Sequence, residues 1–385
     1  MARSILLTGA SGALGPHLLY ELLRCGDVER VFVLLRRSEH PLEHRVRQLH
    51  QAARIFAGAE GDSFASWDRI VPVAVDIRET DLAIGGGASA DTLRTVDTII
   101  HAAANTNFTA PTTELFGVNV AGTRNLLAFA RRCPRLQQFL FVSTACVAGT
   151  RTGVIPECLD DAPPAFVNEY ERTKWQAEQL VATADVPARI VRLSACLGNH
   201  QTGYVHRFGA IHHCLHWLML GLLPMMPGTP TSPVDVIASD VASRWIARVL
   251  NRDCRVLEVC HLAAGERAPS VADLLDYAVE HLQETLPAWN RRQIEPPMIV
   301  DRDTFERFHR SAIQTGDMLF ARVLSSASSF LPALLYPKTY ETTRAEAIWG
   351  GPLPLSDCRS TLAHVIDFGN AHDWKSDERR PRHDS

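Results

Sequence analysis

The stretch that decides the fold is ILLTGASGALGPHLLYELLR, residues 5–24. It places a short apolar run before three spaced glycines, and a helical pattern follows from Leu14 to Arg24. Glycines let a backbone approach a pyrophosphate closely, and the amides at a helix start favour negative phosphates. The alternative is a turn that merely connects strand and helix. We expect a dinucleotide site here, with the following contact residues: Gly9, Ser11, Gly12, Ala13, Leu14 and Gly15.

The rest of the first 200 residues continues this alternation of short apolar runs and longer helical patterns. The predicted strands are Ile5–Thr8, Val31–Leu35, Ile70–Asp76, Thr98–His101, Phe139–Ser143 and Arg189–Leu193. The predicted helices are Leu14–Arg24, Thr112–Arg132 and Phe166–Thr183. Strands separated by helices indicate crossover connections, and hence a buried parallel sheet. The sequence predicts an α/β fold, a doubly wound parallel sheet of the Rossmann type.

The alternation loosens after about residue 195. We expect a dinucleotide-binding domain over 1–200, with a returning strand near 256–262. Residues 201–372 are expected to form a smaller, mostly helical region that mainly binds substrate. Within it, Phe305–Leu335 reads as a packing helix, with a lid helix as the alternative. The charged residues 373–385 contain Pro381 and predict a disordered tail.

Composition excludes several classes of partner. The net charge of −4, from 39 basic and 43 acidic residues, gives no general reason to bind nucleic acid or an anionic membrane. Nine cysteines without a Cys-x-x-Cys pair suit free thiols in a reducing, cytoplasmic compartment. The N-terminus has no signal-peptide pattern, and no apolar run reaches the roughly eighteen residues of a membrane-spanning helix. Peripheral membrane contact stays open.

The ends of the second, third and fourth strands carry further candidate cofactor contacts. Arg36 and then Arg37 follow the second strand, where an acid would accept ribose hydroxyls and a guanidinium would bind a 2′-phosphate. This indicates NADP(H), although a solvated basic loop is the alternative. Asp76 can accept from the adenine amino group. The remaining contacts expected at these strand ends are Ile77, Ala102, Ala103 and Ala104.

Tyr170 and Lys174 stand four residues apart, which places both on one face of a helix. A lysine ammonium near the phenol would lower the tyrosine pKa, so that the hydroxyl could transfer a proton near neutral pH. The lysine could also hold the nicotinamide ribose. The alternative is an exposed pair of an aromatic ring and a cation.

Ser143 and Thr144 stand at the end of the fifth strand, and Thr144 lies 26 residues before Tyr170. We expect Thr144 to donate to a substrate carbonyl oxygen, Tyr170 to supply a proton, and a nicotinamide to supply hydride. Ser143 is expected at the cofactor; alternatively both hydroxyls only cap the strand end. The predicted catalytic residues are Thr144, Tyr170 and Lys174. The other expected cofactor contacts are Asn119, Leu193, Ser194 and Lys174 itself.

Several motif-like residues have simpler interpretations. His206, His212, His213 and His216 cluster in one expected helix, but no acid or cysteine completes a ligand set. We expect no metal there and assign these histidines to a pocket or the surface. Trp217, Met219, Met225 and Met226 are expected in the core or a pocket lining, and they suit an apolar acyl substrate.

Taken together, the motifs resemble the extended short-chain dehydrogenases/reductases, and most of all their thioester-reductase domains and fatty acyl-CoA reductases. The resemblance covers about residues 3–265. It rests on segments 8–15, 101–108, 119–123, 143–145, 170–178, 233–236 and 239–242. A weaker similarity to the C-terminal piece of some acyl reductases lies at 330–332 and 336–337.

The resemblance implies NADPH-dependent reduction of a CoA- or carrier-bound acyl thioester to an aldehyde or alcohol, by a Thr-Tyr-Lys mechanism. The sequence shows no carrier or adenylation domain, so a carrier-bound substrate would come from another chain. The same trio occurs in secondary-alcohol dehydrogenases, so an NADPH-dependent ketone or secondary-alcohol oxidoreductase remains the alternative. A sugar-nucleotide enzyme would be expected to carry an acid after the second strand, where this sequence has Arg36. A non-catalytic NADP sensor would be expected to lack the tyrosine or the lysine.

Overall fold

The computed structural model describes residues 3–57, 66–84, 92–159, 161–254, 256–314 and 318–375. Its centre is a seven-stranded parallel sheet with the strand order β3-β2-β1-β4-β5-β7-β11. The strands are β1 (Arg3–Thr8), β2 (Val28–Arg36), β3 (Ile70–Val75), β4 (Thr98–His101), β5 (Gln138–Thr144), β7 (Ala188–Leu193) and β11 (Glu258–Leu262). The order reverses between β1 and β4, and ligands of such sheets bind where the carboxyl ends of the strands diverge.

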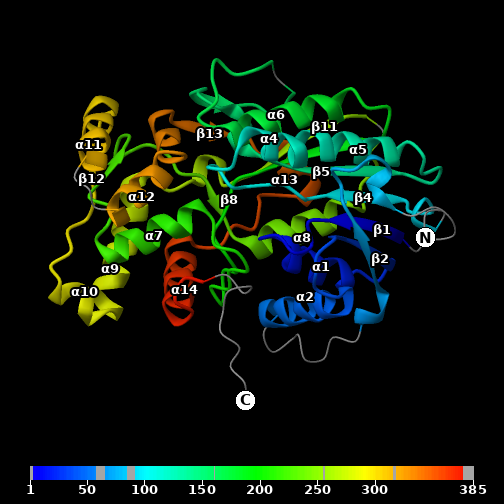
Figure 1. Ribbon diagram of the computed structural model, residues 1–385, viewed down its shortest axis with the longest axis horizontal. Helices are drawn as coiled ribbons and strands as arrows, with labels where there is room; N and C mark the ends of the chain where they lie inside the picture. The colour runs from blue at the N-terminus through cyan, green and yellow to red at the C-terminus, as the bar shows by residue number, and fades with distance from the viewer. Residues whose placement is uncertain are drawn as a thin grey trace.

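Helices cover both faces of the sheet, because successive side chains of a buried strand point to opposite sides. Ile5 and Leu7 belong to the core that includes α1 (Gly15–Arg24) and α8 (Ser239–Val249). Leu6, between them, belongs to a second core. That core includes α5 (Gly122–Ala130) and α6 (Glu169–Ala182), on the opposite side of the sheet in Figure 1. The predicted doubly wound parallel sheet is confirmed.

The segment Thr112–Arg132 was expected as one helix, and the structure divides it. α4 (Thr112–Leu115) runs into a π-helical segment, η4 (Phe116–Ala121), and then into α5. A π-helical turn is wider than an α-turn, often marks a functional site, and leaves little trace in an apolar pattern. This turn carries the buried Asn119.

The chain after residue 201 contributes both to a separate helical region and to the sheet. The helical region, on the left of Figure 1, contains α7 (Ala210–Leu220), α9 (Val271–Thr285), α10 (Pro287–Arg291), α11 (Arg302–Gln314), α12 (Met318–Ala327) and α14 (Cys358–Ala371). By contrast, α8 and β11 return to the sheet, and α13 (Thr343–Trp349) packs against both of them. α2 (Leu42–Ala57) packs against α1.

Three short pairs of parallel strands lie outside the seven-stranded sheet. They are β8 (Ala195–Cys196) with β10 (Val236–Ile237), β9 (Met225–Pro227) with β12 (Met298–Val300), and β6 (Gly153–Ile155) with β13 (Lys338–Tyr340). The last pair places the C-terminal residues 338–340 beside the chain that leaves β5. Among the described helices, none is both long and apolar enough to cross a membrane.

Two C-terminal expectations need correction. Phe305–Leu335 is not one helix: it contains most of α11, then α12 and a 3-10 turn, η7 (Leu331–Leu335). Phe305 and Leu331 are buried together in one apolar cluster, so the segment packs as expected. The tail was expected to begin at residue 373, but Trp374 is buried and stacks on His216 with ring centres 5.3 Å apart. Residues 376–385 of the expected tail lie outside the described residues.

Candidate active site

The three glycines form a tight loop between β1 and α1. Gly9 has a φ of +78°, and a Cβ there would lie 2.5 Å from the carbonyl carbon of Ala102. A Cβ on Gly15 would lie 2.1 Å from the Ala10 oxygen. Both positions therefore require glycine. The Gly12 amide donates to the Gly9 oxygen at 2.8 Å, which closes the loop.

The same loop keeps free donors at the start of α1. Among the described residues, the backbone amides of Ser11, Ala13 and Leu14 donate no hydrogen bond. Pro16 in the first turn has no amide hydrogen to offer. Donors at a helix N-terminus favour an anion, so the loop fits a pyrophosphate.

The ends of β2 and β3 form a basic rim. Arg36 and Arg37 are exposed, and the Arg37 amide donates to the Val75 oxygen at 3.0 Å. Arg78, which the sequence analysis missed, pairs with Asp76 at 2.6 Å. This hydrogen bonding holds the pKa of Asp76 below its ordinary value, so its carboxylate already has a cationic partner. The only sequence signal for Arg78 is a basic residue two positions after an expected site residue.

The loop after β4 is held from below by a buried histidine. The Thr123 hydroxyl donates to the backbone oxygen of Asn119 at 2.7 Å. The hydroxyl oxygen of Thr123 therefore accepts from His101 Nε2, which lies 3.0 Å away. His101 Nδ1 then accepts from Thr8 at 2.8 Å, and the Thr8 oxygen accepts from the Ala103 amide at 3.1 Å. Burial lowers the pKa of His101 to about 3, so this neutral form persists.

The other residues expected along this edge sit nearby in different roles. Ala102, Ala103 and Ala104 are half-buried and small, as a surface against a flat ligand requires. The side chain of Ile77 packs against Gly122, where a Cβ would lie 2.9 Å from it. Asn119 is buried, and its side chain is bonded to other residues of the protein, Asn105 and Thr173. The side-chain oxygen of Asn119 accepts from the backbone amide of Asn105 at 2.8 Å.

Thr144 and Tyr170, which the sequence predicts to be catalytic, lie where β5 ends and α6 begins. Thr144 is the last residue of β5, and its oxygen accepts from the Cys146 amide at 3.2 Å. Burial is the main cause that raises the pKa of Tyr170 above its ordinary value, and hydrogen bonding with Thr144 opposes that rise. The structure thus brings Thr144 and Tyr170 together. The expected lowering of the tyrosine pKa by Lys174 is wrong for this structure, because burial dominates.

Lys174 lies beneath the strand rather than at the phenol. Its ammonium donates to the Val142 oxygen at 2.9 Å and lies 4.1 Å from the centre of the Phe141 ring. Burial lowers its pKa to about 7, and the nearby Glu178 opposes the shift. A lysine with such a pKa exchanges its proton near neutrality.

The hydroxyl of Ser143 is an unpaired polar group at the same edge. It is buried at the end of β5, and its oxygen has no hydrogen-bond partner in the described part of the chain. Leu193 pairs with Thr144 in the sheet register, and the Ser194 amide donates to the Leu262 oxygen at 3.1 Å. An unpaired buried hydroxyl costs free energy, so Ser143 suits a polar ligand group at the cofactor position.

Residues from the C-terminal region also reach this site, and the sequence analysis missed them. Arg207 donates from Nε to the Ser11 oxygen of the glycine loop at 2.7 Å. Phe330 lies 6.0 Å from Phe108, which in turn lies 5.2 Å from Tyr170, between ring centres. The contacts of Arg207 and Phe330 join segments about 200 and 220 positions apart, which local patterns cannot predict.

The histidine group has structural roles. His206 precedes α7 rather than lying in it, and its Nδ1 lies 3.1 Å from the Tyr204 hydroxyl. His212 accepts from the Gly209 amide at 2.9 Å and so caps α7. His213 stacks on Trp217. Within the described ranges, no group of three or more histidine, cysteine or acidic side chains could hold a metal ion.

A glycine loop at the switch point of a parallel sheet, with a threonine, a tyrosine and a lysine at the next strand end, defines the class of Rossmann-type oxidoreductases. The chain belongs to the NAD-binding family described as male sterility protein, which matches residues 7–246.

Relatives narrow this class to acyl reductases and reductase domains. The chain is 30% identical over 278 residues to an isonitrile lipopeptide synthase of Streptomyces coeruleorubidus, which covers 69% of this chain and 17% of that protein. It is 32% identical over 270 residues to fatty acyl-CoA reductase 2 of Mus musculus, covering 62% of this chain and 52% of that one. The chain thus spans only a part of these relatives.

A solved structure shows the same fold over nearly the whole chain. The terminal R domain from the myxalamid PKS-NRPS biosynthetic pathway superposes with a TM-score of 0.78 at 22% identity. The match covers 99% of this chain and 93% of that domain. The chain therefore shares the fold of that R domain over nearly its whole length, including the helical C-terminal region.

Proposed function

We propose that this protein reduces an acyl thioester, bound to CoA or to a carrier protein, to an aldehyde or alcohol with NADPH. The observation that carries the proposal is that Tyr170 lies close to Thr144 at the end of β5, beside a buried Ser143 hydroxyl that has no partner among the described residues. Membership of a family with acyl-CoA reductases supports a thioester as the substrate.

The residues present fit a nicotinamide dinucleotide. The free amides of Ala13 and Leu14 would hold the pyrophosphate, and Ser143 would hydrogen-bond near the nicotinamide. Arg36, with Arg37 next to it in the chain, would bind a 2′-phosphate, since the end of β2 carries no acid that would bind the ribose hydroxyls instead. When bound, the reduced nicotinamide supplies the hydride.

Residues of this chain would then bind the carbonyl oxygen of the substrate. The Thr144 oxygen already accepts from the Cys146 amide, which leaves its hydroxyl proton to donate to the substrate carbonyl. Tyr170 would donate to the same oxygen as negative charge develops on it, and donors aimed at such charge stabilise the transition state. Its raised pKa keeps the phenol protonated and ready to donate. Collapse of the tetrahedral alkoxide then expels the thiolate and leaves the aldehyde.

Lys174 would act behind this pair. Its ammonium lies beneath β5, where it can hold a ribose hydroxyl, and a pKa of about 7 makes its charge responsive to the site. We assign it to orientation and charge balance rather than to direct contact with the carbonyl.

The test is a thioester assay with a thiol readout. Purified protein is mixed with NADPH, or with NADH in parallel, and acyl-CoA thioesters, and both cofactor oxidation and free thiol are followed. Thiol release with one NADPH oxidised per thiol for an aldehyde product, or two for an alcohol product, supports the proposal if it is lost in Tyr170→Phe. Oxidation driven only by ketones, without thiol release, would move the protein to the alternative class of ketone and secondary-alcohol oxidoreductases.

A further inference from the structure

Arg207 connects the chain after β7 to the glycine loop between β1 and α1. Its Nε donates to the backbone oxygen of Ser11 at 2.7 Å, although the two residues lie 196 positions apart in the sequence. The guanidinium of an arginine is planar, stays charged and carries several N–H donors, of which this bond uses one. The half-buried side chain of Arg207 therefore places a permanent positive charge beside the loop.

This charge lies at the end of a helix where a cation is disfavoured. α1 begins at Gly15, and the unpaired amides of a helix N-terminus give it a partial positive charge that favours anions. The amides of Ser11, Ala13 and Leu14 lie in the same loop and donate no hydrogen bond among the described residues. A guanidinium and free amides on one loop together favour a ligand that brings negative charge to it.

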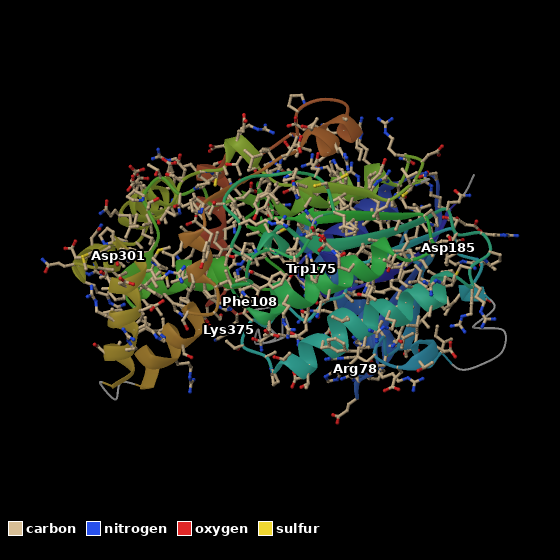
Figure 2. The ribbon with its side chains drawn as sticks, turned by 90° about the horizontal axis from the view of Figure 1, so that it is seen from above. Arg78, Phe108, Trp175, Asp185, Asp301 and Lys375 are labelled. Carbon is tan, nitrogen blue, oxygen red and sulfur yellow. The ribbon has the colours of Figure 1, made fainter. Side chains whose placement is uncertain are left out.

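The chain on both sides of Arg207 is fixed by packing. Before it, His206 is buried, and its Nδ1 lies 3.1 Å from a tyrosine hydroxyl. After it, Phe208 packs on Trp374 with ring centres 5.6 Å apart. Trp374 directly precedes Lys375, which lies between the C-terminal helices and the sheet in the view of Figure 2. A cation on such a fixed segment loses little conformational freedom when it binds a ligand.

A pyrophosphate is the anion that fits this position. The loop already suits one, because a Cβ is excluded at Gly9 and Gly15 and free amides lie at the start of α1. Guanidinium groups bind phosphate oxygens through parallel N–H donors, and hydrogen bonds between charged groups are the strong ones. Because Arg207 is bonded to Ser11 of this loop, its charge lies next to the place where the pyrophosphate would sit.

We propose that Arg207 is a further cofactor-binding residue, whose guanidinium binds the pyrophosphate of the dinucleotide from the side of the C-terminal region. The inference rests on the dinucleotide site of the proposed function, but not on the reduction of a thioester. Arg207 and Arg36 then have different tasks. Arg36 binds the 2′-phosphate that only NADPH carries, whereas Arg207 binds a group that NADPH and NADH share.

The experiment titrates the intact protein, without an acyl substrate, with NADPH, NADH and two fragments in a calorimeter. ADP-ribose contains the pyrophosphate, whereas adenosine 2′-monophosphate lacks it. Arg207→Met removes the charge and keeps a flexible side chain, and Arg207→Lys keeps the charge without the planar fork. The matched control is Arg69→Met, because Arg69 is also half-buried and donates to a backbone oxygen of α1, that of Leu23 near the other end of the helix. Thermal unfolding checks that each variant is folded.

The expected result is a loss of affinity that follows the pyrophosphate. Arg207→Met should weaken NADPH, NADH and ADP-ribose by a similar factor, about tenfold or more, because all three lose the same charge-assisted hydrogen bonds. The affinity for adenosine 2′-monophosphate should change less than about twofold. Arg207→Lys should recover part of the loss. Arg69→Met should lower the unfolding temperature and leave all four affinities unchanged.

Dinucleotide affinity that stays unchanged in folded Arg207→Met would overturn the inference and leave the proposed thioester reduction standing. An equal loss for adenosine 2′-monophosphate would also overturn it, since the variant would then disturb the site as a whole. Titration with CoA tests the substrate as the other source of phosphate. A loss of CoA affinity with unchanged dinucleotide affinity would assign Arg207 to the substrate and refute the assignment to the cofactor. A wild type that binds no dinucleotide would overturn this inference and the proposed function together.

Discussion

The side-chain amide of Asn119 donates to the Thr173 hydroxyl at 3.0 Å, and this bond joins the π-helical segment η4 to helix α6. Thr173 in turn donates to the backbone oxygen of Tyr170 at 3.0 Å. On its other side Asn119 binds the Asn105 backbone, which follows the expected cofactor loop. One buried amide therefore sets the distance between the loop after β4 and the helix that carries the phenol.

Asn119→Leu should destabilise the fold and reduce turnover together. The change leaves the Asn105 amide without its acceptor, and an unpaired buried group costs about 1–3 kcal/mol. Urea unfolding measures the loss. Asn125→Leu is the matched control, since its part-buried side-chain amide donates to the Ile77 oxygen, and a smaller loss is expected there. Similar losses in both variants would refute a special role for Asn119.

Tyr170→Phe should remove most of the activity while keeping the cofactor. The phenyl ring fills the same volume, but the proton donor to the carbonyl oxygen is gone, and such donors contribute about 10²–10⁴ in rate. Steady-state rates with a thioester and NADPH titration by fluorescence measure the two properties. A variant that kept near-normal turnover would eliminate Tyr170 as the proton donor.

Arg36→Ala should weaken NADPH binding about tenfold to a hundredfold and leave NADH binding nearly unchanged, because only NADPH carries the 2′-phosphate. Arg30→Ala is the control, since Arg30 is also exposed on β2 but lies toward its other end. Direct titration of each dinucleotide gives the ratio. An equal loss for both dinucleotides would mean that another group, such as Arg78, binds the phosphate.

The sheet could be predicted from sequence because strands buried on both faces appear as nearly continuous apolar runs. Ile5–Thr8 and Thr98–His101 are found within one or two residues of their expected bounds. The glycine loop was also predictable, since its spacing is local. The division of residues 112–132 into separate helical segments was harder to predict, because a single wide turn at Phe116–Ala121 hardly disturbs a helical pattern.

The site was predictable only where its residues lie close in sequence or at strand ends. Thr144 and Tyr170 come together as expected, whereas the contact of Arg207 with Ser11 depends on how the chain after β7 folds back. The tyrosine pKa was predicted in the wrong direction. Spacing places Lys174 on the same face of α6, but it does not reveal that burial outweighs the lysine charge at the phenol.

Glu171→Gln should stabilise the protein at high pH only. Burial raises the pKa of Glu171 from its ordinary 4.5 to about 7. Between these values the folded state holds a proton that the unfolded chain has released, so stability falls as pH rises and the cost is complete above about pH 7. A neutral amide avoids that cost and still accepts from the Val167 amide.

The expected gain in unfolding free energy is on the order of 3 kcal/mol above pH 7, and it should vanish below pH 4.5. Glu169→Gln is the control. Its pKa is held below the ordinary value by Arg172, so that variant should lose stability at neutral pH rather than gain it. A gain for Glu171→Gln that is the same at every pH would refute the titration argument.

Glu178 and Arg192 form a fully buried ion pair, with their charged atoms 2.9 Å apart. Replacing Glu178 and replacing Arg192 should shift the pH dependence of turnover in opposite directions. Glu178 is the neighbour that holds up the pKa of Lys174, which burial lowers to about 7. Glu178→Gln should lower that pKa further. Arg192→Gln leaves the Glu178 carboxylate without its cation and should raise it.

If turnover needs the lysine as ammonium, activity falls as pH rises through the Lys174 pKa. The fall in kcat/KM should therefore come at lower pH than in the wild type for Glu178→Gln, and at higher pH for Arg192→Gln. Breaking a buried pair costs about 3–5 kcal/mol in either variant, so lost stability cannot explain shifts of opposite sign. Shifts in the same direction, measured on protein shown to be folded, would mean that Lys174 does not set this limb of the profile.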